Sequence, residues 1–465
     1  MEKSKQKTEL QVSATVLSDT EDNKSNPGTA AEYNNTAGVY QDMGDYEKAL
    51  EYYLKALSVK EKALDTEYPD TAVTYNNIAS VYKDMGDYEN ALKYNLKALA
   101  VKEKAFGTEH PDTAVTYNII ASAYQAMGDY DKALEYNLKA LAIKEKALGT
   151  EHPDTAVTYN NIASVYQAMG DYEKALEYNL KAVDVMEKAY GEEHPSTAAA
   201  YNNIAGVYQA MGDYDKALEY NLKGLVIMEK ALGTEHPSTS AAYNNIAGVY
   251  QAMGDYAKAL EYMYKDLAIS EKVLGAEHPD TAAAYNNIAS LYHAMGDYGF
   301  ALKYTLKALA ISEKTLGTEH PSTAATYNNT ASLYRDVGDY DKALEYFNKA
   351  LGVVKKVLGE EHPNVATTYS NIALLYKTMG DYDKALEYYE KAIAVQEKVI
   401  GADHPSTAVT YVNIGALRVR QNKRAEAVKY LTKACDVFDK KLGPAHPNTK
   451  LAHQWLEAAL KLPTD

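Results

Sequence analysis

Cysteine, tryptophan and phenylalanine are all scarce in this chain. Its 465 residues include 1 cysteine, 1 tryptophan and 4 phenylalanines. A single cysteine excludes a disulfide framework and a cysteine-rich metal site, and it fits a reducing compartment. No segment approaches the roughly 18 apolar residues of a membrane-spanning helix, and residues 1–26 lack the apolar core of a secretory signal. We therefore expect a cytoplasmic protein without membrane insertion.

Positive charge is also in deficit. Lysine and arginine total 48, against 64 aspartates and glutamates, which gives a formal net charge of −16. A protein that binds nucleic acid without sequence preference needs a basic surface from which counterions are released. The charge balance therefore argues against a nucleic-acid partner.

Tyrosine, in contrast, is abundant, with 43 copies, and it belongs to a repeat. Prolines recur at a fixed spacing of 42 residues, at positions 27, 69, 111, 153, 195, 237, 279, 321, 363, 405 and 447. A period between about 20 and 50 residues indicates a repeat array rather than the three globular domains that the length alone suggests. The tyrosines then amount to about four in each copy.

The array divides the chain into three parts. Residues 27–448 hold ten copies without an insertion or deletion. Residues 1–26 carry no copy and mix charges with Ser, Thr and Asn, so we expect a disordered tail in which a short helix from Leu10 to Leu17 is an alternative. Residues 449–465 form a truncated copy, which we expect to be a capping helix and a short tail.

Each copy predicts a helical hairpin. In the first helix of one central copy, Tyr159, Ile162, Ala163 and Tyr166 form an apolar stripe at helical spacing. The residue after each proline from Pro69 onward is Asp, Ser or Asn, residue types whose side chains cap free backbone N–H groups. We expect these residues to be the N-caps.

The second helix of this copy follows the break at Gly170, and Gly191, which is suited to a left-handed C-cap, ends it. Ala163, Ala175 and Ala182 recur through the copies, and small side chains let two helix axes approach closely. The tyrosines, for which Tyr159 is typical, are expected on the seam between the helices.

This pattern of aromatic, Leu or Ile, Ala, Tyr, Gly-x-Tyr, Ala and Ala resembles the tetratricopeptide repeat, whose usual period is about 34 residues. The longer period here, with Leu-Gly-Thr-Glu-His-Pro-Asp-Thr at 148–155, resembles the kinesin light chain and nephrocystin-3-like type. The resemblance covers residues 29–461. It implies an all-α fold, a right-handed TPR superhelix (an α-solenoid) of ten helical hairpins plus a C-terminal capping helix, with the first helices lining a concave groove.

Pairs of asparagine fall on the side of the first helix opposite the apolar stripe. An amide both donates and accepts hydrogen bonds, so a ladder of amides can hold the backbone of an extended peptide without reading its side chains. The resemblance implies that the second asparagine of a pair contacts bound peptides. The alternative is that the asparagines bond to the neighbouring helix and fix the superhelix, and the two roles can coexist. The predicted groove asparagines are Asn77, Asn160, Asn161, Asn202, Asn203, Asn244, Asn245, Asn286, Asn287 and Asn329.

Charges along this predicted groove are uneven. Lys83, Arg335, Lys377 and Arg420 are the predicted groove cations, and three of the four lie toward the C-terminal end. Electrostatic complementarity would draw an acidic peptide segment to that end and set its register. Random drift of the outer repeats is the alternative explanation.

The remaining candidates favour structural roles. Histidines recur once per copy in the turn before the proline, and metal ligands that are one repeat apart cannot converge on one ion, so we expect turn packing. Cys435 is expected to be buried. The basic residues at 418–424 and Trp455 are expected to cap the array, with a binding patch and a ligand anchor as their alternatives.

The sequence therefore predicts a non-enzymatic protein–protein interaction scaffold, without cofactor or metal, that binds an extended peptide segment of a partner. A kinesin-light-chain-like cargo adaptor, with a motor heavy chain as its partner, is one alternative. Residues 1–26 contain no heptad segment of the length that binds the heavy chain in that family. A purely architectural spacer is the other alternative.

Overall fold

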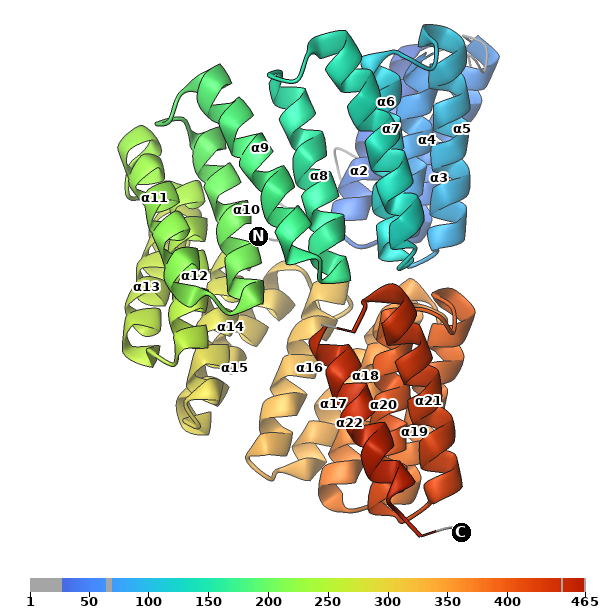
Figure 1. The fold of residues 1–465 in the computed structure, drawn as a ribbon, viewed down its shortest axis with the longest axis vertical. Coiled ribbons are helices and arrows are strands. Elements are labelled where there is room, and N and C mark those ends of the chain that lie inside the picture. The colour runs from blue at the N-terminus through green and yellow to red at the C-terminus, as the bar shows by residue number, and fades with distance from the viewer. Residues whose placement is uncertain (1–26, 64–68, 445, 464–465) are drawn as a thin grey trace. The chain divides into compact units, whose positions relative to one another are not determined.

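The computed structural model describes residues 27–63, 69–444 and 446–463, and every secondary-structure element within these ranges is helical (Figure 1). The helices pair into ten hairpins, and one more helix follows them. The expected all-α hairpin array is therefore confirmed. The expected disordered tail, with its alternative short helix, lies outside the described residues.

The first helices of the hairpins all begin at a proline of the 42-residue series. They are α2 (Pro27–Asp42), α4 (Pro69–Asp84), α6 (Pro111–Ala126), α8 (Pro153–Met169), α10 (Pro195–Met211), α12 (Pro237–Met253), α14 (Pro279–Ala294), α16 (Pro321–Asp336), α18 (Pro363–Met379) and α20 (Pro405–Arg420).

The second helices begin at a tyrosine, except the last. They are α3 (Tyr46–Ala63), α5 (Tyr88–Phe106), α7 (Tyr130–Leu148), α9 (Tyr172–Tyr190), α11 (Tyr214–Leu232), α13 (Tyr256–Ile269) with the π-turn η2 (Ser270–Leu274), α15 (Tyr298–Thr315), α17 (Tyr340–Leu358), α19 (Tyr382–Val399) and α21 (Arg424–Lys441). Helix α22 (Pro447–Leu460) follows. Within the described ranges, no helix is long and apolar enough to cross a membrane.

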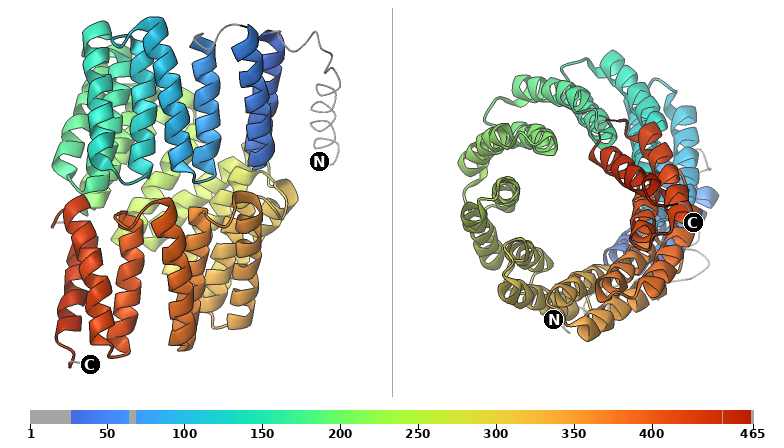
Figure 2. Two further views of the ribbon diagram at one scale, coloured as in Figure 1. Left: turned by 90° about the vertical axis from the view of Figure 1, so that its right-hand side faces the viewer. Right: turned by 60° about the horizontal axis from the view of Figure 1, so that its bottom comes forward.

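The contacts divide the chain into two compact units, Met1–Ile143 with Val354–His362, and Lys144–Val353 with Pro363–Asp465. In the first unit, α2 to α6 follow one another in chain order, and the left view of Figure 2 shows neighbouring helices side by side. In the second unit, each helix from α8 to α15 packs on the next helix in the chain, and so does each from α18 to α21. The core of each unit is therefore a series of seams between successive helices.

Histidine caps most of the first helices. Nδ1 of His152 accepts a hydrogen bond of 3.1 Å from the backbone N–H of Asp154, and Pro153 takes the first helical position, where its missing N–H has no partner to lose. The predicted capping by the residue after the proline is therefore wrong, because Asp154 already lies inside the helix and donates to the cap. The same cap begins α6, α10, α12, α14, α16, α20 and α22.

Two glycines end the helices of a hairpin in different ways. Gly170 follows α8 in the left-handed helical conformation, with φ 80° and ψ 8°, and Asp171 then caps α9 by accepting the N–H of Lys174. Gly191 follows α9 with φ 90° but ψ 162°. It needs the positive φ that favours glycine, but it continues as extended backbone, so the left-handed cap predicted there is wrong.

Tyrosine rings fill the seam inside each hairpin, as expected. The rings of Tyr166 in α8 and Tyr178 in α9 stack with centroids 5.8 Å apart, and Tyr159 tilts against Tyr178 at 6.1 Å. Ala163 and Ala182 are buried beside them. The predicted apolar stripe is observed, and the small residues Ala163 and Ala182 are buried as expected.

A phenol–carboxylate hydrogen bond joins most second helices to the first helix that follows them. Tyr369 is the exception, because Lys355 stands 14 residues before it. Tyr159 Oη donates to Oε1 of Glu145, in the preceding second helix, over 2.7 Å. Burial, with the bond from Tyr117 to Glu103 adding to it, raises the pKa of Tyr117 to about 12. The same bond, with the glutamate always 14 residues before the tyrosine, forms at Tyr75, Tyr117, Tyr201, Tyr243, Tyr285, Tyr327 and Tyr411.

Basic residues at the C-terminal end of the array bond to other residues of the same segment. Arg418 pairs with Glu426 at 2.8 Å, and Arg424 donates to the carbonyl oxygen of Leu462 at 3.1 Å. These contacts favour a capping role over a binding patch for Arg418 and Arg424. Cys435 is buried, as predicted, and Trp455 is half-buried on α22.

Candidate peptide-binding face

The predicted asparagines lie on the first helices, on the side that faces away from the tyrosine seam, and they are exposed or half-buried. We call the side of the first helices that carries these residues the Asn face. Asn203, Asn245 and Asn329 are exposed. The half-buried members are Asn77, Asn160, Asn161, Asn202, Asn244, Asn286 and Asn287.

The first asparagine of a pair turns toward the helix seams. Oδ1 of Asn160 is buried and accepts no hydrogen bond from the described residues. An added Cβ at Gly224 in α11 would lie 2.9 Å from Oδ1 of Asn202, so this amide lies against the second helix of its own hairpin. In α16, Nδ2 of Asn328 donates to Oγ1 of Thr368 in the next first helix over 3.2 Å. These contacts support the structural role for the first asparagine. Buried, unpaired Oδ1 atoms also occur at Asn76, Asn202 and Asn286.

The second asparagine of a pair points outward. Asn161, Asn203 and Asn245 make no hydrogen bond to any described residue, so their donors and acceptors face solvent. Asn287 is an exception, because its Nδ2 donates to Oδ1 of Asn244 in the preceding first helix over 3.0 Å. The resemblance implied a peptide contact for the second asparagine of a pair, and in these three copies its polar atoms are the ones left without a partner among the described residues.

In the first unit, polar side chains near the C-terminal ends of the first helices bridge adjacent hairpins. Nε2 of Gln41 donates to Oδ2 of Asp84 over 2.6 Å. One repeat later, Nζ of Lys83 lies 3.5 Å from Oγ of Ser122, and Lys83 itself is exposed. Lys83 therefore occupies the predicted face while it also joins two first helices.

The predicted cation Arg335 is bonded to its own neighbour. Its guanidinium donates to both carboxylate oxygens of Asp336, from Nε over 2.8 Å and from Nη2 over 3.2 Å. His293 contacts the same carboxylate at 2.6 Å. Burial alone would raise the pKa of Asp336, but the bonds from Arg335 and His293 hold it below its usual value. The sequence reasoning missed Asp336, and this carboxylate compensates the charge that Arg335 was expected to offer.

Lys377 and Arg420 are the predicted cations near the C-terminal end that no carboxylate compensates among the described residues. Lys377 is half-buried on α18, and Arg420 is exposed at the end of α20. Burial, and then the nearby charge of Arg420, lower the pKa of Lys377. Neither side chain forms an ion pair with a described residue. An anionic group placed beside both cations would relieve their repulsion.

A polar pocket of about 190 Å³ lies on this face between α14 and α16. Asn286, Asn329 and His293 line it, together with Thr305 from α15. Its lining therefore combines the first asparagine of one pair, Asn286, with the second asparagine of the next pair, Asn329.

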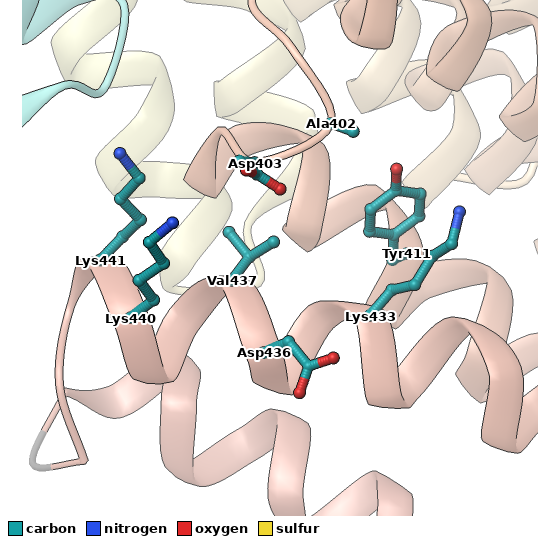
Figure 3. Close-up of a pocket in the computed structure, with 8 residues that line it drawn as sticks. All are labelled: Ala402, Asp403, Tyr411, Lys433, Asp436, Val437, Lys440 and Lys441. Atoms are coloured by element: carbon teal, nitrogen blue, oxygen red, sulfur yellow. The ribbon is translucent and has the colours of Figure 1, made fainter.

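Another pocket, of about 230 Å³, lies on the outer side of the last hairpin (Figure 3). Lys433, Lys440 and Asp436 line it from α21, and Nζ of Lys433 sits over the ring of Tyr411 at 5.1 Å. It contains no asparagine, and its lining mixes both signs of charge, as surface ion pairs such as Lys188 with Glu151 do in other copies. We assign no ligand to it.

Eight of the recurring histidines occupy cap positions, and Nδ1 of each accepts the backbone N–H two residues later in its own helix. Among the described residues, no three His, Cys, Asp or Glu side chains gather closely enough to hold a metal ion.

Comparison with known proteins identifies the family of the repeat. The tetratricopeptide repeat family matches in overlapping windows at 28–104, 70–146, 112–188, 154–230, 196–265, 238–314, 280–356, 322–398 and 364–440. No curated protein matches the chain.

Solved structures show similar repeats. The kinesin light chain-like, nearly identical repeats of Podosopora anserina are 32% identical, with 44% of this chain and 98% of that chain covered and a TM-score of 0.38. BtubC (BKLC) of P. vanneervenii is 20% identical over 50% of this chain and 91% of its own, with a TM-score of 0.40. A Rap protein complexed with competence and sporulation factor is 16% identical over 85% and 98% of the two chains, with a TM-score of 0.45.

Proposed function

Because this chain belongs to the tetratricopeptide repeat family, we propose that it is a non-enzymatic protein–protein interaction scaffold that binds an extended segment of a partner protein along the Asn face. The single cysteine, buried in α21, favours a cytoplasmic setting for this scaffold.

The observation that carries the proposal is the open second asparagine. Asn161, Asn203 and Asn245 recur at one-repeat spacing and offer both donors and acceptors that no described residue uses. Each amide can bond to the N–H and C=O groups of an extended backbone. A typical hydrogen bond contributes about 0.5–1.5 kcal/mol net, so several in register are needed for stable binding.

Charge at the other end of the Asn face would set the register of the bound segment. Lys377 and Arg420 have no ion-pair partner among the described residues, whereas the charge of Arg335 is compensated by Asp336. We expect an acidic stretch of the partner beside Lys377 and Arg420, because complementary charges mainly govern orientation and the rate of encounter.

The experiment is affinity capture from the protein's own cell extract with the full chain and two matched variants. In the test variant Asn161, Asn203 and Asn245 become alanine; in the control variant the buried-side residues Asn76, Asn160 and Asn202 become alanine. We expect the test variant to lose most partner recovery at an unchanged melting temperature, and the control variant to melt at a lower temperature. Unchanged recovery by the test variant would refute binding through the Asn face and favour the architectural spacer.

The 42-residue period, which resembles the kinesin light chain type, keeps a cargo adaptor as the second candidate. Capture of a motor heavy chain by the full chain would support the adaptor. Recovery of other proteins without a heavy chain would favour the general scaffold.

A further inference from the structure

The α12–α13 hairpin departs from the repeat at two facing positions. Asp266 stands in α13 where eight other hairpins have alanine and the remaining one has Gly224. Ser240 stands in α12 where the nine other hairpins have alanine. Both substitutions replace a small apolar residue of the seam with a polar one.

Asp266 is buried with only half of its carboxylate bonded. The side chain is 8% exposed. Oγ of Ser240 donates to Oδ1 of Asp266 and lies 3.2 Å from the backbone oxygen of the same residue. Oδ2 accepts no hydrogen bond from the described residues, and none of their cations pairs with Asp266. Burial raises the pKa of Asp266, with the bond from Ser240 opposing the shift.

The backbone opens beside this carboxylate. The N–H of Gly275 bonds to the carbonyl oxygen of Ser270, five residues back, over 3.1 Å, whereas the N–H of Gly191 bonds to Glu187, four residues back. Gly401 and Gly443 make the same bond to the residue five back, but among the described second helices the last turn is a π-turn, η2, only here, although the repeat contains no insertion. Single π-turns inside α-helices often mark functional sites.

The wider turn borders a pocket of about 220 Å³ between α12, η2 and α14. Asp266 lines it, while Ile269, Val273 and Leu274 form apolar walls and Asp280 lies at the exposed rim. The lining contains no lysine, arginine or histidine. The volume is about seven times the ~30 Å³ that one water occupies in the liquid, enough for one long side chain.

The pocket lies on the Asn face. Asn244 and Asn287, which are hydrogen-bonded to each other, line it together with Ala241 and Ala283. A peptide that runs along the second asparagines therefore passes its mouth.

We propose that this pocket binds the side chain of a lysine or arginine from the partner segment, with the cationic group paired to Asp266. The inference rests on the proposed function, because it assigns a residue to the segment that the Asn face binds. A buried carboxylate is costly unless it is paired, and an ammonium or guanidinium group supplies the missing donor for Oδ2. The apolar walls fit the methylene stem, which long basic side chains bury while their charge finds a partner.

The direct test uses the full chain and small probes. Nα-acetyl-lysine amide and Nα-acetyl-arginine amide are titrated by NMR, with Nα-acetyl-norleucine amide as the uncharged control and Nα-acetyl-glutamate amide as the anionic one. We expect the two basic probes to bind and to shift signals around Asp266, and the stronger binder identifies which cation the pocket prefers. The two control probes should not bind there.

Variants then assign the binding to the carboxylate. D266A restores the residue of the other hairpins and D266N keeps the shape, so both should fold, which melting curves verify. We expect either variant to weaken the basic probes at least tenfold. D154N is the matched control, because Asp154 occupies the position of Asp280 in a copy where the second helix before it has Ala140 at the position of Asp266, and it should bind the probes as the unaltered chain does.

Equal binding of the basic probes by the unaltered chain and D266N, or no binding by the unaltered chain, would overturn the cation pocket. Its failure differs from failure of the scaffold. If probes bind at Asp266 but no partner depends on Asn161, Asn203 and Asn245, the Asn face is wrong and the pocket stands. If partner capture depends on those asparagines and the probes do not bind at Asp266, the cation pocket is wrong and binding through the Asn face stands.

Discussion

Single residues that differ between otherwise similar copies give the clearest physical contrasts in this protein. The core position held by Ala182 in one hairpin holds Asp266 in another, with the same 42-residue register around it. The aspartate has one serine donor and no cation among the described residues. The repeat itself thus provides the reference state in which the effect of a buried carboxylate can be measured.

We predict that Asp266→Ala raises the free energy of unfolding at pH 7 by about 1–3 kcal/mol, because an incompletely paired polar group leaves the core. The pKa of Asp266 is raised in the folded chain, so the folded state holds this proton more tightly than the unfolded state. The contribution of Asp266 to the stability of the unaltered chain therefore falls as pH rises from about 3.9, the unfolded value, through the folded pKa. Urea unfolding should show a gain that shrinks below about pH 4. A gain that is equal at both pH values would contradict this explanation.

At the scale of one helix, the start of most hairpins depends on an uncommon cap, a histidine. His194 accepts the N–H of Ser196 through Nδ1 over 3.1 Å, and Pro195 sits between them. Serine is a common capping residue, but here it lies one position too late, because the fixed φ of proline already suits the first helical residue. Position relative to the backbone, rather than residue type, selects the cap.

Replacement of the capping histidine should therefore lower the free energy of unfolding, whereas replacement of the serine should leave it nearly unchanged. We predict that His194→Ala lowers the free energy of unfolding by about 0.5–2 kcal/mol, the range for lost N-caps. Ser196→Ala should stay within about 0.5 kcal/mol, as surface substitutions usually do. Denaturant unfolding of the two variants checks this, and a larger loss from Ser196→Ala would restore the serine as the cap.

At the scale of the whole chain, the stabilising effects of contacts that recur from copy to copy add along the array. The bond from tyrosine to the glutamate 14 residues earlier links successive hairpins in both units, for example Tyr117 to Glu103 and Tyr159 to Glu145. Each repeat in such an array is stabilised mainly by its immediate neighbours. Loss of one kind of contact in every copy should therefore weaken all of these seams together.

We predict a steep loss of stability in alkaline solution. The pKa of Tyr117 is raised to about 12 by burial and by Glu103. Its contribution is therefore complete below the unfolded value of about 10 and is lost as pH rises through about 12. Melting temperatures followed by circular dichroism should fall across this window. Ultraviolet absorbance should show phenolates appearing together with unfolding, and phenolates that form near pH 10 while the helices persist would contradict the prediction.

The sequence by itself was sufficient for the hairpin array. The period, the Tyr159–Tyr166 stripe and Gly170 predict two antiparallel helices per copy, because helical periodicity and chain breaks are local properties that neighbouring residues encode. The predicted face of the first helices follows from the same periodicity.

Only the tertiary structure decided which polar groups on that face are free. Which of Asn160 and Asn161 turns outward depends on the packing of other helices. Whether Arg335 or Lys377 keeps an uncompensated charge depends on the side-chain conformation that brings a carboxylate within reach. The spacing of residues in the sequence reveals neither. The same holds for Asp266, whose effect comes from burial against Ser240, 26 residues away. Local patterns determined the elements, whereas desolvation and pairing across elements decided the chemistry of the surface.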